Sequence, residues 1–152
     1  MTFDISYNAI SGSIPKEVGI LKNLLKLDLG ANAFIGPIST VIFLLTNLTY
    51  LSVYNNKLTS ELPQSLANLT QLVTFNLSCN FSSGSIPKKL GNLKNLLYLD
   101  LQENNLIGPI LLSLGQLTNL ISLSLSSNQI NGSILSEIGN MKNLSAYCVV
   151  PQ

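Results

Sequence analysis

Apolar and polar residues follow one another along this chain in a pattern that returns at every 24th position. Six evenly spaced positions hold asparagine: Asn8, Asn32, Asn56, Asn80, Asn104 and Asn128. Apolar residues recur five and three positions before each asparagine, and again six and ten positions after it. A fixed period of about 20–50 residues is the signature of a repeat architecture, in which each unit buries its apolar side against its neighbours.

Each unit is expected to begin with a short β-strand. Segments 26–30, 98–102 and 122–126 alternate polar and apolar residues with a period of two, which predicts half-buried strands. Glycine follows the asparagine by four positions in every unit except the one with Ser60, and it permits a turn. Proline seven positions after the asparagine suits the start of a short helical turn. Four glycines are predicted to end such turns: Gly19, Gly91, Gly115 and Gly139.

The regular asparagines have a predicted structural role. They follow the strands, where a side-chain amide can hydrogen-bond the backbone groups that a turn exposes. Buried polar groups need partners, so we expect the six side chains to stack as a hydrogen-bonded ladder inside the molecule.

Two segments carry a family resemblance, Ser-Ile-Pro-Lys-Glu-Val-Gly-Ile-Leu-Lys-Asn-Leu at 13–24 and Ser-Ile-Pro-Lys-Lys-Leu-Gly-Asn-Leu-Lys-Asn-Leu at 85–96. They resemble the plant-specific class of leucine-rich repeat, and the resemblance covers essentially the whole chain. It implies an α/β solenoid, a right-handed coil with a parallel β-sheet on its concave face and short helical or irregular returns on its convex face. We expect a single domain over residues 1–152, with about six 24-residue units.

The same resemblance sets expectations for the ends and the cysteines. The sequence starts and stops inside a unit and lacks the paired-cysteine caps of the family, a signal peptide, a transmembrane helix and kinase motifs, so we expect a domain truncated at both ends. Cys79 and Cys148 fall three units apart, about 14 Å at the usual strand spacing. A disulfide needs Cα atoms within about 7 Å, so both thiols are expected to be free.

Composition narrows the chemistry. Only 10% of the residues are charged, the net charge is +1 and there is no histidine. Clustered basic residues for nucleic acid are therefore missing, as are His-dependent catalytic triads and most zinc sites. We expect neither an enzyme nor a bound cofactor. The long uncharged stretch at 104–136 is interrupted by Pro109, Asn119 and several serines, so no membrane insertion is expected from this segment.

A candidate binding surface follows from the strand pattern. The positions six, four, two and one before each asparagine are expected to be exposed on the concave face. Neighbouring strands should bring seven of these side chains into one patch: Tyr50, Tyr54, Asn76, Tyr98, Asp100, Gln102 and Glu103. Tyrosines among polar groups suit a protein or peptide contact. The alternative is that these are the ordinary polar residues of this repeat class.

Six Asn-x-Ser/Thr sequons suit a secreted protein: Asn47, Asn68, Asn76, Asn80, Asn131 and Asn143. Asn80 belongs to the predicted ladder, so it should be buried and unmodified. Four sequons fall on the return segments and are the candidate glycosylation sites: Asn47, Asn68, Asn131 and Asn143.

The resemblance implies a recognition module, the partial ectodomain of a leucine-rich repeat receptor-like kinase or receptor-like protein in signalling or defence. Its expected partners are a protein or peptide ligand and, as a second partner, a coreceptor; no nucleic acid is expected. The parent protein is expected at the extracellular face of the plasma membrane or in the cell wall. Two alternatives stay open: a fragment of a polygalacturonase-inhibiting protein, and a truncated gene product without a function of its own.

Overall fold

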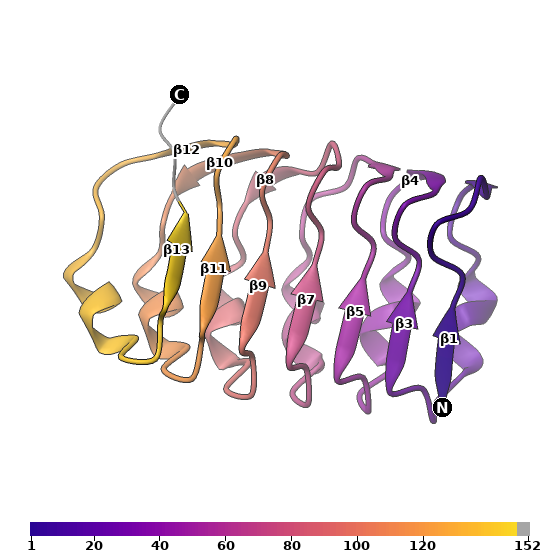
Figure 1. The fold of residues 1–152 in the computed structure, drawn as a ribbon, viewed down its shortest axis with the longest axis horizontal. Helices are drawn as coiled ribbons and strands as arrows, with labels where there is room; N and C mark the ends of the chain where they lie inside the picture. The colour runs from indigo at the N-terminus through magenta and orange to yellow at the C-terminus, as the bar shows by residue number, and fades with distance from the viewer. Residues whose placement is uncertain (149–152) are drawn as a thin grey trace.

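The protein is a solenoid of stacked coils (Figure 1). The computed structural model describes the backbone of residues 1–148 and the side chains of residues 1–145. Strands form the front layer in Figure 1, short helices form a layer behind it, and the coils follow one another from the N-terminal to the C-terminal end. The predicted right-handed leucine-rich repeat coil, with its parallel sheet on the concave face, is confirmed.

One sheet of seven parallel strands forms the front layer. Its strands are shorter than the alternating segments predicted, since each covers only the first part of such a segment. Each residue pairs with its equivalent in the next coil, as Phe3 does with Leu27, because one full turn of chain separates them. The strands are β1 (Thr2–Asp4), β3 (Lys26–Asp28), β5 (Tyr50–Ser52), β7 (Thr74–Asn76), β9 (Tyr98–Asp100), β11 (Ser122–Ser124) and β13 (Ala146–Cys148).

A second strand in each of the first six coils was not foreseen from the sequence. These strands form two three-stranded parallel sheets, β2 (Ser11–Gly12) with β4 (Ala33–Gly36) and β6 (Lys57–Leu58), and β8 (Ser83–Ser85) with β10 (Asn105–Pro109) and β12 (Gln129–Asn131). Between β6 and β8 a single bridge remains, from Glu61 to Ser83. The gap follows Ser60, which stands where the other units have a glycine with φ of 75° to 90°. A side chain disfavours that conformation, so the regular path of the strand is lost there.

The returns are six short 3₁₀ helices: η1 (Lys16–Ile20), η2 (Thr40–Leu44), η3 (Gln64–Asn68), η4 (Lys88–Asn92), η5 (Leu112–Gln116) and η6 (Ser136–Asn140). Among the described residues no helix is long and apolar enough to span a bilayer.

The prediction that glycines end the returns is wrong. All four of these glycines lie inside the 3₁₀ helices, just before the last residue: Gly19, Gly91, Gly115 and Gly139. A Cβ added at Gly91 would lie 2.1 Å from the carbonyl oxygen of Ser113, and one at Gly19 would lie 2.6 Å from the Cβ of Val41. Glycine is needed at these two places because adjacent coils approach closely, not because the backbone turns.

Five of the six regular asparagines bind neighbouring coils to one another. Asn8, in the first coil, is exposed and donates only to the carbonyl oxygens of Ile5 and Ser6 in its own coil, so the predicted burial is wrong there because no coil precedes it in the stack. The Nδ2 of Asn56 donates to the carbonyl oxygens of Val53 (3.0 Å) and Tyr54 (3.1 Å) in its own coil, and of Leu29 (3.1 Å) in the preceding one. Its Oδ1 accepts the backbone N–H of Phe34 at 2.9 Å. Each asparagine therefore satisfies backbone groups that the turn leaves without partners. The same four contacts recur at Asn32, Asn80, Asn104 and Asn128.

The residue before each of these asparagines adopts a left-handed backbone. Its φ lies between 49° and 56°, and none of the six is a glycine: Tyr7, Ala31, Asn55, Cys79, Glu103 and Ser127. L-residues other than asparagine lose about 1–2 kcal/mol in that region. The turn is nevertheless retained in every coil, because the ladder hydrogen bonds and the buried leucines on either side require it.

Candidate functional site

The outer surface of the seven-stranded sheet is the candidate site, and we call it the open face. It comprises the outward side chains of β1 to β11 and those that follow each strand as far as the ladder asparagine. The side chains between them are the buried leucines and phenylalanines of the core, such as Leu51 and Phe75 at 0% exposure. The alternation of the strands therefore presents their polar positions on one surface.

Exposure on the open face is less uniform than the sequence predicted. Asp28 and Ser52 were expected to be exposed but are 7% and 0% exposed. Larger neighbouring side chains cover them. For example, the Tyr50 hydroxyl lies against the Asp28 carboxylate. Gly30 is buried for the same reason: the ring of Tyr54 lies so close that a Cβ on Gly30 would meet it at 2.2 Å.

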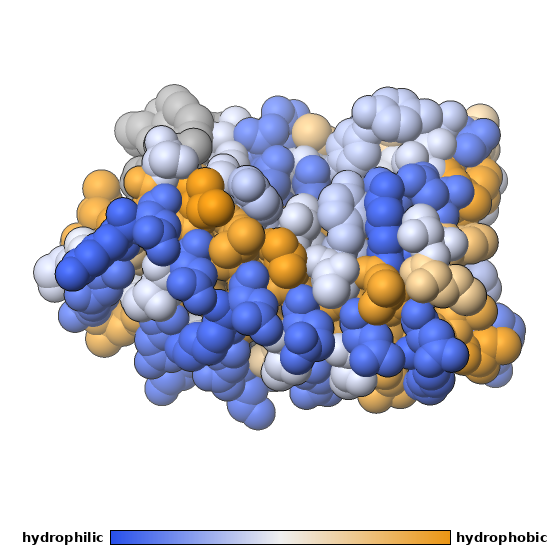
Figure 2. All heavy atoms as spheres, turned by 60° about the horizontal axis from the view of Figure 1, so that its bottom comes forward, coloured by the Kyte–Doolittle hydropathy of each residue, from blue (hydrophilic) through white to orange (hydrophobic). Residues whose placement is uncertain are grey.

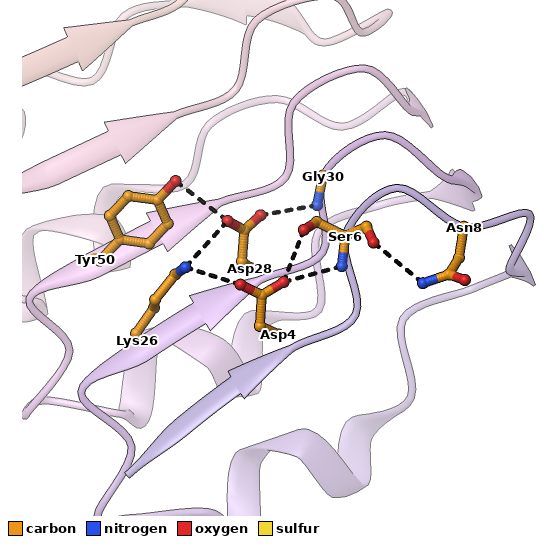
Figure 3. A network of polar contacts seen from close by, with 7 residues as sticks. All are labelled: Asp4, Ser6, Asn8, Lys26, Asp28, Gly30 and Tyr50. Atoms are coloured by element: carbon orange, nitrogen blue, oxygen red, sulfur yellow. Dashed lines mark hydrogen bonds and ion pairs between the residues drawn. The ribbon is translucent and has the colours of Figure 1, made fainter.

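Figure 3 shows a network of hydrogen bonds and ion pairs near β1, which includes the charged residues at that end of the open face. We call Asp4, Lys26, Asp28 and Tyr50 the Lys26 cluster. The Lys26 Nζ lies 2.8 Å from Asp4 Oδ2, 3.6 Å from Asp28 Oδ2 and 4.9 Å from the centre of the Tyr50 ring. The Tyr50 hydroxyl donates to Asp28 Oδ2 at 3.2 Å, and the backbone N–H of Gly30 donates to Asp28 Oδ1 at 3.1 Å.

Strand register explains why this lysine matters. Asp4 and Asp28 are direct partners in the β1–β3 pairing, and two like charges in such positions repel each other. The ammonium of Lys26 lies between them. Its hydrogen bond, together with those from Ser6, lowers the pKa of Asp4 to about 2, and the Asp4 carboxylate in turn raises the pKa of Lys26.

The second tyrosine of β5's coil, Tyr54, turns toward the N-terminal end. Its ring meets that of Tyr7 edge to face, with centroids 6.0 Å apart and an angle of 68° between the planes. Its hydroxyl is enclosed and makes no hydrogen bond within the described part of the chain. Tyr54 is therefore packed into the open face rather than presented by it.

A different arrangement surrounds β7 and β9. We call Asn76, Tyr98, Asp100, Gln102 and Glu103 the Tyr98 patch. Tyr98 is 45% exposed. Among the described residues, no lysine nitrogen lies within 4 Å of the Asp100 or Glu103 carboxylates. Asp100 Oδ1 accepts the backbone N–H of Gln102 at 3.1 Å, and Glu103 Oε2 faces the Cys79 Sγ at 3.5 Å.

Burial raises the pKa of two groups in or beside the Tyr98 patch. It is the main cause that raises the pKa of Asp100 above its usual value, and it does the same for the Cys79 thiol, with the nearby Glu103 carboxylate as a further cause. Cys79 is a free thiol, as predicted, whereas the Cys148 side chain lies outside the described residues. Ionised carboxylates without cations are what a cationic group from outside would neutralise.

The predicted seven-residue patch thus falls into two parts. Tyr50 and Tyr54 belong with the N-terminal network, and the other five members form the Tyr98 patch. Lys26, Asp4 and Asp28 were not predicted as a unit from the sequence. A signal was present, because Asp4 and Asp28 are equivalent positions of successive units and Lys26 stands two positions before the second of them. Stacking the units therefore places the lysine diagonally between the two carboxylates.

Apolar side chains border the open face where the chain enters the strands. The residues that directly precede β7, β9 and β11 are Val73, Leu97 and Ile121, all half-buried. Figure 2, which brings the lower edge of Figure 1 forward, shows orange apolar side chains in a band above the blue polar side chains of that edge.

A cavity of about 360 Å³ lies away from the open face, on the return side. It is lined mainly by apolar residues, among them Ile110, Leu112 and Leu135, together with Lys88. In the described part of the chain no three residues among His, Cys, Asp and Glu lie together so that they could hold a metal ion.

The chain matches the family described as a leucine-rich repeat region over residues 4–150. No curated protein matches it. Among solved structures it resembles the ectodomain of the Arabidopsis thaliana membrane receptor kinase GASSHO1/SCHENGEN3, in complex with CASPARIAN STRIP INTEGRITY FACTOR 2. The two are 40% identical with a TM-score of 0.92 over 94% of this chain and 17% of the receptor chain.

Two other plant receptors give the same result. The peptide hormone receptor RGFR1, in complex with RGF2, is 43% identical with a TM-score of 0.92, over 94% of this chain and 23% of its own. The Arabidopsis receptor kinase HAESA, in complex with the peptide hormone IDA and the co-receptor SERK1, is 33% identical with a TM-score of 0.93. That match covers 97% of this chain and 25% of the HAESA chain.

The sequence spans at most a quarter of these three receptor chains. Its periodic asparagines, its seven-stranded parallel sheet and its similarity to these ectodomains agree. The chain belongs to the leucine-rich repeat family and is built like the ectodomains of plant membrane receptor kinases.

Proposed function

We propose that the open face recognises an extended peptide or a protein segment, as part of a plant receptor-like kinase or receptor-like protein outside the plasma membrane. The observation that carries this proposal is the Tyr98 patch. There an aromatic ring is 45% exposed beside two carboxylates that have no cation partner among the described residues. Tyrosine supplies contact area at a low cost in side-chain entropy, and polar groups around it supply direction.

Charge complementarity defines the ligand further. The open face carries Asp4, Asp28, Asp100 and Glu103, but only one of the eight lysines, Lys26. That lysine is already paired. A segment with a lysine or arginine fits such a surface, with its cation beside Asp100 and Glu103 and its stem on Tyr98.

The similar receptors support this assignment. GASSHO1/SCHENGEN3, RGFR1 and HAESA each appear in complex with a ligand, and HAESA with the co-receptor SERK1 as well. A parent receptor of this chain would use the same division of labour, in which the repeats bind the ligand and other parts transmit the signal. The repeats themselves would perform no covalent chemistry.

Selection from a library of random 12-residue peptides, displayed against the purified chain, tests the proposal. We expect the enriched peptides to carry Lys or Arg and to bind at the Tyr98 patch. Tyr98→Ala should weaken a selected peptide by about tenfold, the effect of losing an interfacial anchor of about 1.4 kcal/mol. Binding would be followed by titration calorimetry.

Phe81→Ala is the matched control, because Phe81 is an aromatic residue of similar exposure (55%) that is not part of the open face. It should leave peptide binding unchanged. If no peptide is enriched, or if Phe81→Ala weakens binding as much as Tyr98→Ala does, the open face is not the recognition surface.

An enzyme inhibitor of the polygalacturonase-inhibiting type is the second candidate. The observation that favours it is the Lys26 cluster, where charged and aromatic side chains meet on the open face. Its lysine and aspartates neutralise one another, which leaves little charge for an enzyme surface. Slower pectin hydrolysis by a fungal polygalacturonase in the presence of the chain, restored by Lys26→Ala but not by Tyr98→Ala, would favour this candidate over the first.

A further inference from the structure

The six sequons differ in what their side-chain amides do in the folded protein. We infer that Asn68 and Asn131 are N-glycosylation sites, and that their glycans cover the return side and the second sheets while the open face stays free. This inference requires the chain to enter the secretory pathway, as its proposed location does. It does not require that the chain binds a peptide.

Asn68 and Asn131 can accept a glycan without loss of an existing contact. Asn68 is the last residue of η3 and Asn131 the last of β12, and both are exposed. Neither side-chain amide makes a hydrogen bond to any described residue. Their sequons are complete, with Thr70 and Ser133 at the third position.

Asn47 and Asn143 are exposed as well, but their amides are used between coils. The Nδ2 of Asn47 donates to the Lys22 carbonyl oxygen at 3.0 Å, and that of Asn143 donates to the Thr118 carbonyl oxygen at 3.3 Å. The equivalent side chains in two other coils make the same bond without being part of a sequon: Asn95 and Asn119.

This second column of asparagines therefore has a structural role of its own. A sugar on Asn47 or Asn143 would replace one of the two hydrogens of an Nδ2 that is bonded to a carbonyl of the preceding coil, so it must leave the bonded hydrogen in place and is held close to that coil. These two sequons are poor sites in the folded protein despite their exposure.

The last two sequons are shielded in the folded protein, one inside the ladder and the other on the seven-stranded sheet. Asn80 is 6% exposed, and its Nδ2 donates to three carbonyl oxygens, so a glycan there is incompatible with the ladder. Asn76 lies half-buried on the open face, where its Oδ1 accepts both the N–H and the hydroxyl of Ser78. Only the first pair of sequons combines exposure with an unengaged amide and a place outside the seven-stranded sheet.

The modification itself is a group transfer from a lipid-pyrophosphate-linked oligosaccharide. The Nδ2 of the asparagine attacks C1 of the first sugar, so an N–C bond forms and the C1–O bond to the pyrophosphate breaks. The amide loses one proton to a base, and the lipid pyrophosphate leaves. The host transferase supplies both the donor and the base, and the chain supplies only the acceptor nitrogen.

The test is expression of the whole chain behind a heterologous signal peptide in plant cells, with glycopeptide mass spectrometry of both the secreted and the cell-retained protein. We expect high occupancy at Asn68 and Asn131, severalfold lower occupancy at Asn47 and Asn143, and none at Asn76 or Asn80 in the secreted protein. Asn68→Gln and Asn131→Gln should each remove one glycan from the intact mass.

Thr70→Ala and Ser133→Ala are matched controls that destroy each sequon but keep the asparagine, and each should remove the same glycan. Unmodified Asn68 and Asn131 in both fractions, or a glycan on Asn76 or Asn80 of secreted protein, would overturn the inference. Bacterially produced, unglycosylated chain serves the peptide selection, so failure of one proposal is distinguishable from failure of the other.

Discussion

At the β1 end of the open face, Lys26 lies between the carboxylates of Asp4 and Asp28, whereas around β9 Asp100 and Glu103 have no such cation among the described residues. Both regions stand on the same backbone, because each coil repeats the last at a constant register. The difference lies in the next strand, where β3 carries Lys26 and Asp28 beside Asp4 and β11 carries Ser122 and Ser124 beside Asp100. The first region uses its charges to hold neighbouring strands together, and the second leaves its charges available to a partner.

Removing one aspartate from each region gives the largest expected contrast. Asp28→Ala leaves the Gly30 N–H and the Tyr50 hydroxyl without their acceptor in a buried place, so the free energy of unfolding should fall by about 2 kcal/mol. Asp100→Ala removes only the acceptor of the Gln102 N–H, in a partly buried place that water can reach, and burial already disfavours the Asp100 charge, so the loss should be about 0.5 kcal/mol. Urea unfolding followed by circular dichroism measures both. Equal losses would show that the two regions do not differ.

Ser122→Lys would give Asp100 the neighbouring lysine that Asp4 has in the first region. Ser122 stands to Asp100 as Lys26 stands to Asp4, on the next strand and one step along the diagonal. The new ammonium should bring the pKa of Asp100 below its usual value, where burial now holds it above, and should stabilise the fold by about 0.5 kcal/mol. It should also weaken a selected basic peptide at least about fivefold. NMR titration and calorimetry test this, and an unchanged peptide affinity would contradict the proposed role of Asp100.

Lys26→Met performs the reverse conversion and should be visible in the pH dependence. The pKa of Asp4 lies near 2 in the folded chain, below its ordinary 3.8, so its contribution to stability is complete above pH 3.8 and is lost as the pH falls toward 2. Without the lysine, the pKa of Asp4 should rise toward 3.8, and stability should fall less steeply across this window. An Asp4 titration that stays near 2 would assign the shift to Ser6 instead.

The smallest effects are expected at the left-handed residues that precede the ladder. Asn55 occupies this position beside the N-terminal network, whereas Ser127 occupies it at the other end. Asparagine tolerates that backbone better than serine does, so Ser127→Asn should stabilise the chain and Asn55→Ser destabilise it, each by about 0.5 kcal/mol. Thermal unfolding of the two variants would show opposite shifts, and shifts of the same sign would rule out a backbone origin.

The ladder and the core could be predicted from the sequence because both depend on register alone. A residue such as Asn56 recurs once in every unit, and stacking the coils brings its amide against the backbone of the preceding coil. Burial on the open face could not be predicted in the same way. Ser52 is 0% exposed because larger side chains cover it. Its exposure therefore depends on the size of the adjacent side chains rather than on its own position in the repeat.

The second strands escaped prediction for another reason. Their pairing is shifted against the repeat, since Ala33 pairs with Ser11 rather than with its own equivalent, Ala9. Equivalent positions therefore do not face each other in these sheets. The side chains there also vary, from Ala9 to Lys57 to Phe81, and show no alternation. Ser60 is recognisable in the sequence as the one exception to the glycine column. Its position between the two smaller sheets could not be predicted, because those sheets were not predicted.

The gap between these two sheets interrupts the second row of strands near the middle of the domain. On the strand side, backbone hydrogen bonds run without a break from the first coil to the last, and they resist bending there. Along the second strands the regular pairing is interrupted after Lys57–Leu58, yet the backbone N–H groups of Phe81 and Ser83 still donate to the carbonyl oxygens of Leu58 and Ser60 at 2.8 and 3.3 Å. A bending load applied to the solenoid would therefore be shared by both rows of strands, and the interruption at Ser60 would not divide the domain into independent blocks.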